Sequence, residues 1–293
     1  MPQILNFSDL QWLPKHHEED PFGPGPNFWL ADNAEVIKDD LHLRIRRQGG
    51  RWACAEVYTK EALGYGTYTF QIVGQLDKLD PQIVLGLAAC PLPDTAPDGM
   101  HEITIATEVQ PHTSDHHIVF KVYPTEETLV CQEWAMPLQL NGTHITYQFQ
   151  WTRSQILFKA WHGHTAESQE RLITEWLLVP EEDYLPHRPM PLHLNLWLKE
   201  GVAPRDGKEV EIVIRKFTYE PALFLTLAEI QIEQILAVLE FTEGRIEGPR
   251  GAAKILAIPP TTLRDRIKQW GLEKKHNELK KKHSHGYRGL GFY

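Results

Sequence analysis

The sequence predicts a mostly β protein, with a β-sandwich or jelly roll over residues 1–220 and a small all-α domain after it. Three observations predict this class. Short runs of alternating apolar and polar residues recur through the first part of the chain, and Gly, Pro, Asn and Asp separate many of them. After Pro221 the hydrophobic period changes from two to about 3.6, which indicates helices. The many short strands favour a sandwich or jelly roll.

The expected strands follow one another along the first 220 residues. In order they are DLHLRIRR, WACAEVYT, GTYTFQIVG, IVLGLAAC, HEITIATEV, HIVFKVY, THITYQFQW, QILFKAW, HLNLWLK and EVEIVIRKFTYE. In the fifth run, Ile103 and Ile105 define one apolar face. The opposite face carries Glu102, Thr104, Ala106 and Glu108. We expect this strand to have one face in the core and one face toward solvent.

The expected helices begin and end at recognisable residues. A T-x-x-E capping box at Thr226 and Glu229 opens the first helix. Pro249 can start the second helix and Pro260 the third, which Gly271 ends. Three short helices with a tight turn between the last two are typical of a helix-turn-helix unit. This gives a domain over 221–273, followed by a basic tail over 274–293.

Composition limits the classes of protein. The chain is 42% hydrophobic and 24% charged, as expected for a globular protein, and its net charge is −9. It has no apolar run of about 18 residues, and its start lacks the pattern of a signal peptide, so we expect a cytoplasmic protein without a membrane span. Cys54, Cys90 and Cys131 are widely spaced in apolar surroundings, which favours buried thiols. No metal-ligand spacing is found, and no cofactor is expected.

The C-terminal end is basic, with 12 Lys and Arg against 4 Asp and Glu from Arg245 onward. The segment ILAVLEFTEGRIEGPRGAAKILAIPPTTLRDRIKQWGL resembles the C-terminal helix-turn-helix of the Fis family, as found in bacterial enhancer-binding activators. The resemblance implies a third helix in the DNA major groove and a homodimer that pairs through the helix around 227–242. The DNA contacts that it implies are Arg250, Thr261, Thr262, Arg264, Arg266 and Lys268.

The first domain has a resemblance of its own. Over roughly residues 25–220, the segments AEVYT, LGYGTYTF, HEITIATE, LNLWL and GKEVEIVIRKFTYE resemble the concanavalin-like jelly roll of glycoside hydrolase family 16. In that family the strand corresponding to HEITIATE reads E-I-D-I-E and supplies a nucleophile, an orienting Asp and an acid/base Glu. Glu102 matches the nucleophile, whereas Thr104 and Ala106 occupy the other two positions.

The resemblance therefore implies a degenerate catalytic motif, with remnants Glu102, Thr104 and Ala106. Glu108 lies on the correct face but six residues on, which at ~3.3 Å per residue is roughly 20 Å from Glu102. Retaining hydrolysis needs two carboxyl groups about 5–5.5 Å apart. Since each acid–base function is worth about 10²–10⁴-fold, we expect a pseudoenzyme without catalytic residues.

Such a jelly roll can hold a glycan on its concave face against aromatic rings. The candidate carbohydrate-binding residues are Trp52, Tyr65, Trp134 and Trp197. Aromatic residues of β-sandwiches lie mostly in the core, which is the alternative for each of them. Asn195 and Trp197 have the same strand parity and share one face, which the sequence does not identify.

Together these patterns predict a sequence-specific DNA-binding transcriptional regulator, with a catalytically degenerate jelly roll that senses an oligosaccharide or serves as a platform. The chain has no GxxxxGK[ST] motif, so it lacks an ATPase signature. Two alternatives stay open. One is a glycoside hydrolase acting on a β-glucan, with Glu102 and an acid from a neighbouring strand. The other is a helical tail that binds protein.

Overall fold

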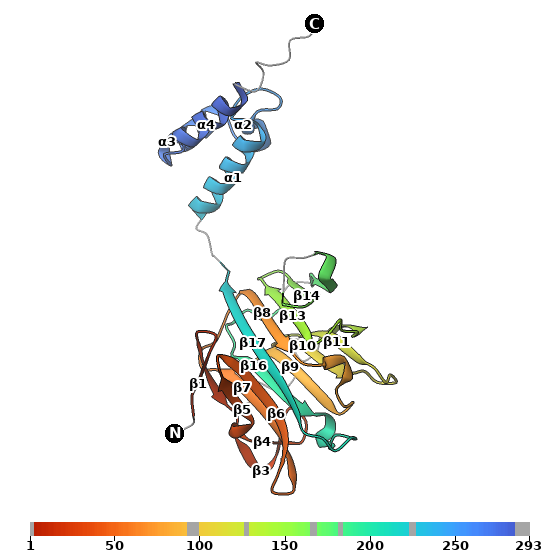
Figure 1. Cartoon of the computed structure of the whole chain (residues 1–293). Coiled ribbons are helices and arrows are strands. Elements are labelled where there is room, and N and C mark those ends of the chain that lie inside the picture. Colours follow the sequence, from red (N-terminus) through yellow and green to blue (C-terminus); the bar gives the residue numbers. More distant parts are fainter. Residues whose placement is uncertain are drawn as a thin grey trace. The chain divides into compact units, whose positions relative to one another are not determined.

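The computed structural model describes residues 3–92, 100–125, 129–164, 169–180, 184–222 and 227–284 (Figure 1). The chain divides into two compact units, Met1–Ala222 and Leu223–Tyr293. The first is a mostly β sandwich, and the second consists of a few short helices. Each unit is described below by itself.

The first unit contains two antiparallel layers of strands (Figure 1). The first layer has the spatial order β1 (Leu5–Phe7), β2 (Leu10–Pro14), β7 (Arg51–Thr59), β16 (Leu192–Leu198), β9 (Ile83–Ala89), β10 (Glu102–Val109), β11 (His116–Tyr123) and β12 (Gln132–Pro137). The second has the order β5 (Ala34–Ile37), β6 (Asp40–Gln48), β17 (Val210–Pro221), β8 (Gly66–Val73), β13 (His144–Trp151), β14 (Ile156–His162) and β15 (Leu172–Leu178).

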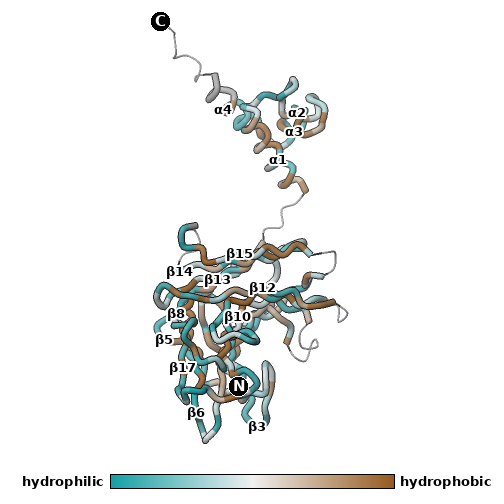
Figure 2. The backbone as a smooth tube through the Cα atoms, turned by 90° about the vertical axis from the view of Figure 1, so that its right-hand side faces the viewer, coloured by the Kyte–Doolittle hydropathy of each residue, from teal (hydrophilic) through white to brown (hydrophobic). Residues whose placement is uncertain are grey.

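Short segments connect the two layers. The β6–β7 hairpin passes from one layer to the other, and β4 (Asn27–Trp29) pairs in parallel with β7. Strand β3 (His17–Phe22) pairs with β4 and is mostly exposed, in keeping with its hydrophilic colour in Figure 2. The 3-10 helices are η1 (Ala31–Asn33), η2 (Leu76–Lys78), η3 (Gln169–Arg171) and η4 (Lys199–Gly201).

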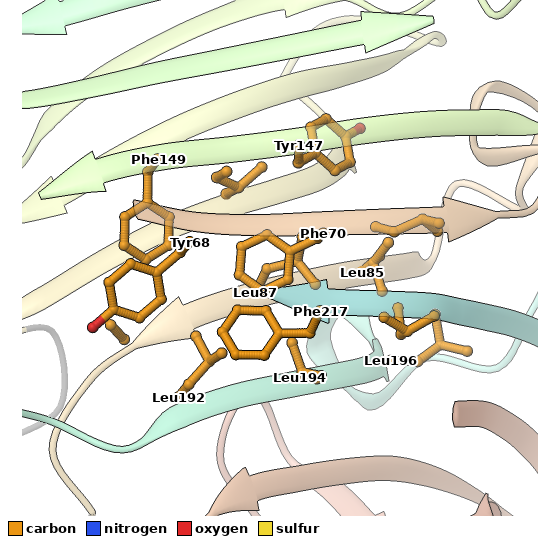
Figure 3. Packing of buried hydrophobic residues seen from close by; sticks show 14 of the residues in the cluster. Tyr68, Phe70, Leu85, Leu87, Tyr147, Phe149, Leu192, Leu194, Leu196 and Phe217 are labelled. Atoms are coloured by element: carbon orange, nitrogen blue, oxygen red, sulfur yellow. The ribbon is translucent and has the colours of Figure 1, made fainter. Parts of the chain in front are cut away.

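The core lies between the layers, and each layer contributes a different kind of side chain. The second layer supplies rings from β8, β13 and β17, whereas the first supplies leucines from β9 and β16 (Figure 3). The rings are Tyr68, Phe70, Tyr147, Phe149 and Phe217, and the leucines are Leu85, Leu87, Leu192, Leu194 and Leu196. All ten side chains are at most 2% exposed. The period-two pattern of the sequence therefore has its expected physical cause, which is a buried face on each strand.

The same alternation determines which side chains face away from the core. On β16 the even-numbered leucines are in the core cluster, so His193, Asn195 and Trp197 point to the other side of the layer. On β10, Ile103 and Ile105 are in the core, as the sequence predicts. Glu102, Thr104, Ala106 and Glu108 consequently share the outer face with the odd-numbered residues of β16.

Over residues 227–284, the described part of the second unit, there are four helices, α1 (Leu227–Phe241), α2 (Ala252–Ile255), α3 (Pro260–Gln269) and α4 (Glu273–Ser284). Its small core contains Leu239, Leu263, Ile267 and Leu279. Gly271 has φ +66° directly after α3, where a left-handed residue ends a helix. The Thr226 end of the expected capping box lies outside the described residues. The helices show the expected all-α character but do not establish a helix-turn-helix domain.

None of the helices in the described part of the chain combines the length and the apolar character that crossing a membrane requires.

Candidate active site

A cavity of about 660 Å³ lies on the outer face of the first layer. Its walls come from β7, β9, β10, β11 and β16, together with the segment around β3. Its polar lining includes Lys15, Glu56, Glu102, Thr104, Glu108, Lys121, Tyr123, His193 and Asn195. Trp197 adds an aromatic ring to the wall. The cavity therefore gathers ionisable groups and one large ring on a single face of the sheet.

Strand β10 supplies Glu102, Thr104, Ala106 and Glu108 to the lining. The Thr104 hydroxyl donates a hydrogen bond to Glu102 Oε1. Ala106 is opposite Gly86 of β9, so neither residue has a side chain larger than a methyl group. No carboxyl group projects into the cavity from this position of the strand. The strand keeps an acid at each end of the cavity face and small side chains between them.

A buried charged cluster forms another part of the wall. Glu56 Oε2 lies 3.0 Å from Lys15 Nζ, and Glu56 Oε1 lies 2.9 Å from His193 Nδ1. Burial alone would raise the pKa of Glu56, but the hydrogen bond from His193 and the positive charge of Lys15 lower it below its usual range. Glu56 is therefore an ionised carboxylate held by two donors.

A second ion pair lies between β10 and β11. Lys121 Nζ is 2.7 Å from Glu108 Oε1 and 3.6 Å from Glu133 Oε2. Burial opposes the charge of Lys121, yet Glu108 raises its pKa. Burial also raises the pKa of Tyr123 to about 12, with the negative charge of Glu102 as a further cause. Lys121 is opposite Thr104, so this ion pair joins positions four residues apart along β10.

Only one of the predicted carbohydrate-binding residues lies in this cavity. Trp197 lines it, whereas Trp52, Tyr65 and Trp134 do not, and all four rings are partly buried against the core cluster. Trp134, for example, stacks on Phe120 with the ring centroids 5.6 Å apart. Carbohydrate binding by these three rings therefore stays a prediction. Within the described ranges, no group of three or more His, Cys, Asp and Glu side chains is placed to hold a metal ion.

Sequence reasoning missed Lys15, Glu56 and His193. Two of them carried a usable signal. Glu56 is the only acid in the apolar run WACAEVY, and His193 has the same strand parity as Asn195. Lys15 follows a short strand and belongs to no sequence pattern that would mark it as a site residue. Only the three-dimensional structure shows that it lies beside Glu56.

The residues predicted to contact DNA lie in the helical unit. Arg250 is exposed just before α2, and Thr261, Thr262, Arg264, Arg266 and Lys268 lie on α3. Arg264 does not extend free into solvent, because its guanidinium pairs with the Glu247 carboxylate at 2.5 Å.

Solved structures resemble the chain in fold. One is a prokaryotic β-1,3-1,4-glucanase (lichenase) derived from a mouse hindgut metagenome, with TM-score 0.55 and 20% identity, over 76% of this chain and 99% of that one. Another is the Bacillus licheniformis β-glucanase, with TM-score 0.52 and 18% identity, over 72% and 92%. A third is a Bacteroides ovatus mixed linkage glucan protein of glycoside hydrolase family 16 in complex with a G4G4G3G product, with TM-score 0.56 and 14% identity, over 71% and 94%. No protein-family model and no curated protein sequence matches the chain.

These neighbours contradict our prediction of a DNA-binding transcriptional regulator. They are described as glucanases or as a glycoside hydrolase family 16 protein, and none as a DNA-binding protein. The basic C-terminal segment and the Fis resemblance gave that prediction, although most of the chain lies in the jelly roll. We therefore no longer expect DNA as a partner. The expected homodimer came from the same Fis resemblance, so it loses its support as well. An oligosaccharide ligand agrees with the neighbours.

The prediction that the chain is not an enzyme is wrong as well, because proteins described as glucanases share this fold and the hydrolase alternative fits them better. That prediction considered acids on one strand only. The cavity also collects Glu56 of β7 and His193 of β16, which the E-I-D-I-E comparison did not count. The first unit therefore has a glycoside-hydrolase-family-16-like jelly-roll fold.

Proposed function

We propose that this protein is a glycoside hydrolase that cleaves a β-linked glucan in the cavity of its first layer. The observation that carries the proposal is Glu102, whose carboxyl group lines the cavity from the central strand β10. The strand comparison gives Glu102 the position of the family nucleophile. The neighbours act as support, since those named glucanases share the fold.

The charges of the cavity favour a neutral ligand. Lys15 pairs with Glu56, and Lys121 pairs with Glu108, so each of the two lysines already has a carboxylate partner. A neutral sugar needs hydrogen-bond partners and an apolar ring to stack on, and it needs no unbalanced charge. Asn195 and Trp197 offer an amide and an aromatic ring on the same wall.

The backbone of the loop that contains Gly25 lies close to the Trp197 ring. Gly25 has φ +63°, and a Cβ there would be 3.2 Å from the Trp197 ring and 2.9 Å from Asn27 Nδ2. Only glycine adopts this backbone conformation easily with so little room. We propose that this contact fixes the Trp197 ring as a stacking surface for a glucose unit.

Glu102 is the residue whose removal tests the proposal. The full chain is incubated with mixed-linkage β-1,3-1,4-glucan and with β-1,3-glucan, and new reducing ends are measured. We expect the native protein to release them, and Glu102→Gln to lower the rate by about 10²–10⁴-fold, the range for losing one such group. Glu175→Gln is the matched control, because Glu175 lies on β15 in an exposed pair with Lys159. Absence of reducing ends with the native protein on both glucans would overturn the proposal.

For the helical unit we propose a fold only. A helix-turn-helix arrangement of α2 and α3 is supported by the resemblance of their sequence, and an NMR structure of the full chain in solution tests it. The domain limits 1–220, 221–273 and 274–293 stay a proposal. Limited proteolysis tests the limit at 273: cleavage before α4 would support it, whereas protection of α4, whose Leu279 is buried in the helical core, would move the limit beyond α4. The cytoplasmic location also stays a prediction.

A further inference from the structure

We propose that His193 is the acid/base group that works with Glu102, and that Glu56 is its positioning residue. This inference rests on the proposed glucan hydrolysis. It answers the question that Ala106 raises, because the strand position of the family acid/base carries only a methyl group here. The proton would come from a different strand, β16, and from an imidazole in place of a carboxyl.

The contacts of His193 carry the argument. Its Nδ1 lies 2.9 Å from Glu56 Oε1, and its ring stacks on Tyr58 with the centroids 5.5 Å apart. Its Nε2 is buried and has no hydrogen-bond partner among the described residues, although the side chain lines the cavity. A buried polar atom without a partner is rare and calls for an explanation. A bound ligand atom in the cavity would supply that partner.

The sheet register places His193 nearer to Glu102 than Glu108 is. His193 and Thr104 are both opposite Ala88, so they lie in one row across three strands. Two strand spacings of ~4.8 Å and two residues of ~3.3 Å put the Cα atoms of His193 and Glu102 roughly 12 Å apart, against roughly 20 Å between Glu102 and Glu108. Both side chains point to the same face, and the small Ala88 between them leaves the space open for a sugar ring.

The surroundings of His193 also fit an acid/base role. A carboxylate on Nδ1 holds the ring in one orientation and one tautomer, as in other histidine dyads. Glu56 is kept ionised by Lys15 as well as by His193, so it is available for this purpose. The other titratable or charged groups facing the same cavity are Lys15, Cys90, Glu102, Glu108, Lys121 and Tyr123. Glu108 is committed to Lys121 at 2.7 Å, which leaves His193 better suited to exchange a proton.

The chemistry balances in two steps. In the first, a carboxylate oxygen of Glu102 bonds to C1 of the sugar, the C1–O bond to the leaving sugar breaks, and His193 Nε2–H gives its proton to the leaving oxygen. In the second, neutral Nε2 takes a proton from water, the water oxygen bonds to C1, and the C1–O bond to Glu102 breaks. Water is the only co-reactant, and His193 and Glu102 return to their starting states.

The test compares two substrates that differ in how much they need an acid. Mixed-linkage β-glucan has a poor leaving group, whereas a 2,4-dinitrophenyl glycoside of a β-gluco-oligosaccharide leaves without protonation. With the full chain, we expect His193→Ala to lower kcat/KM on the polymer by about 10²–10⁴-fold and on the dinitrophenyl substrate by less than tenfold. Added imidazole should restore part of the lost rate. Glu56→Gln should move the alkaline limb of the pH profile on the polymer.

His42→Ala is the matched control, because His42 Nδ1 also pairs with a glutamate, Glu211, at 3.0 Å, but on strand β6 of the other layer. Should His193→Ala fail to fold, His193→Asn takes its place, since its amide can still donate to Glu56. Equal losses on both substrates, or no loss on the polymer, would overturn the inference while Glu102→Gln still upholds the hydrolase. A native protein inactive on both substrates would overturn the proposed function and this inference together.

Discussion

Adding one methyl group to Gly86 perturbs the cavity in a way that the structure makes calculable. Gly86 lies on β9 between Asn195 of β16 and Ala106 of β10. A Cβ at this position would be 2.3 Å from Asn195 Oδ1, well inside van der Waals contact. The Asn195 side chain is 8% exposed and its Oδ1 has no hydrogen-bond partner among the described residues. In Gly86→Ala the amide must therefore move.

Two opposing effects set the size of the change. Forcing a buried side chain to shift costs about 1–3 kcal/mol, the range for overpacking. Replacing glycine inside a strand reduces the freedom of the unfolded chain and returns about 0.5–1 kcal/mol. We expect Gly86→Ala to lower the free energy of unfolding by roughly 1 kcal/mol. In an Asn195→Ala background the clash is absent, so the same change should raise it by about 0.5–1 kcal/mol.

Urea denaturation of the four proteins measures this double-mutant cycle, with tryptophan fluorescence as the signal for the jelly roll. The expected coupling between the two positions is about 1–3 kcal/mol, as for residues in direct contact. If Gly86→Ala has the same effect with and without the Asn195 amide, the amide does not overhang Gly86 and our description of the cavity wall is wrong.

Three further predictions concern the core and the buried charges. Leu194→Ala should destabilise the jelly roll by about 2–5 kcal/mol in urea denaturation, because this fully buried side chain packs between the layers; a change below 1 kcal/mol would contradict that packing. Burial raises the pKa of the Cys54 thiol to about 12, so iodoacetamide at pH 8 should label Cys54 only after unfolding, as peptide mass spectrometry can show. Although burial opposes it, His193 and Lys15 lower the pKa of Glu56 below its usual value of 4.5. As the pH falls, Glu56 is therefore protonated at a higher pH in the unfolded chain than in the folded protein. The stability that Glu56 contributes is thus present above pH 4.5 and lost as the pH falls through the folded pKa; urea midpoints between pH 7 and pH 3 should fall less steeply for Glu56→Gln, and parallel curves would refute this.

Period-two patterning predicted the mostly β character of the first unit and the strands β6–β11, β13, β14, β16 and β17, but not β1–β5, β12 and β15. HEITIATE forms a strand with Ile103 and Ile105 in the core and Glu102, Thr104, Ala106 and Glu108 on the other face. That face was expected to point toward solvent, but Thr104, Ala106 and Glu108 are buried. Shared parity also put Asn195 and Trp197 on one face, and the structure identifies that face as a wall of the cavity. These inferences succeed because strand alternation is a local property of the chain.

What the sequence did not predict depends on contacts between distant segments. Glu56 and His193 are 137 positions apart in the sequence and meet only because β7 and β16 are neighbours in the first layer. Considering β10 alone made the loss of acids at Thr104 and Ala106 look decisive. Alternation does not reveal the order of strands in a jelly roll. It therefore could not show which residues line the cavity.

The error about function had a different origin. Helix α3 begins at Pro260 as expected and ends two residues before Gly271, whereas α2 begins at Ala252 and not at Pro249. The expected tail from residue 274 contains most of helix α4 instead. A helical unit of about 60 residues is nevertheless compatible with many partners, and fold alone does not give function. Arg264 illustrates the point, since its charge is paired with Glu247.

The most direct measurement is the mass spectrum of products formed from a mixed-linkage β-glucan oligosaccharide by the native chain and by Glu102→Gln. The account predicts shorter oligosaccharides with the native chain, the two products of each cleavage together exceeding the substrate mass by one water, and unchanged substrate with Glu102→Gln over the same time. Identical spectra for the two proteins would contradict it, whether both cleave the substrate or neither does.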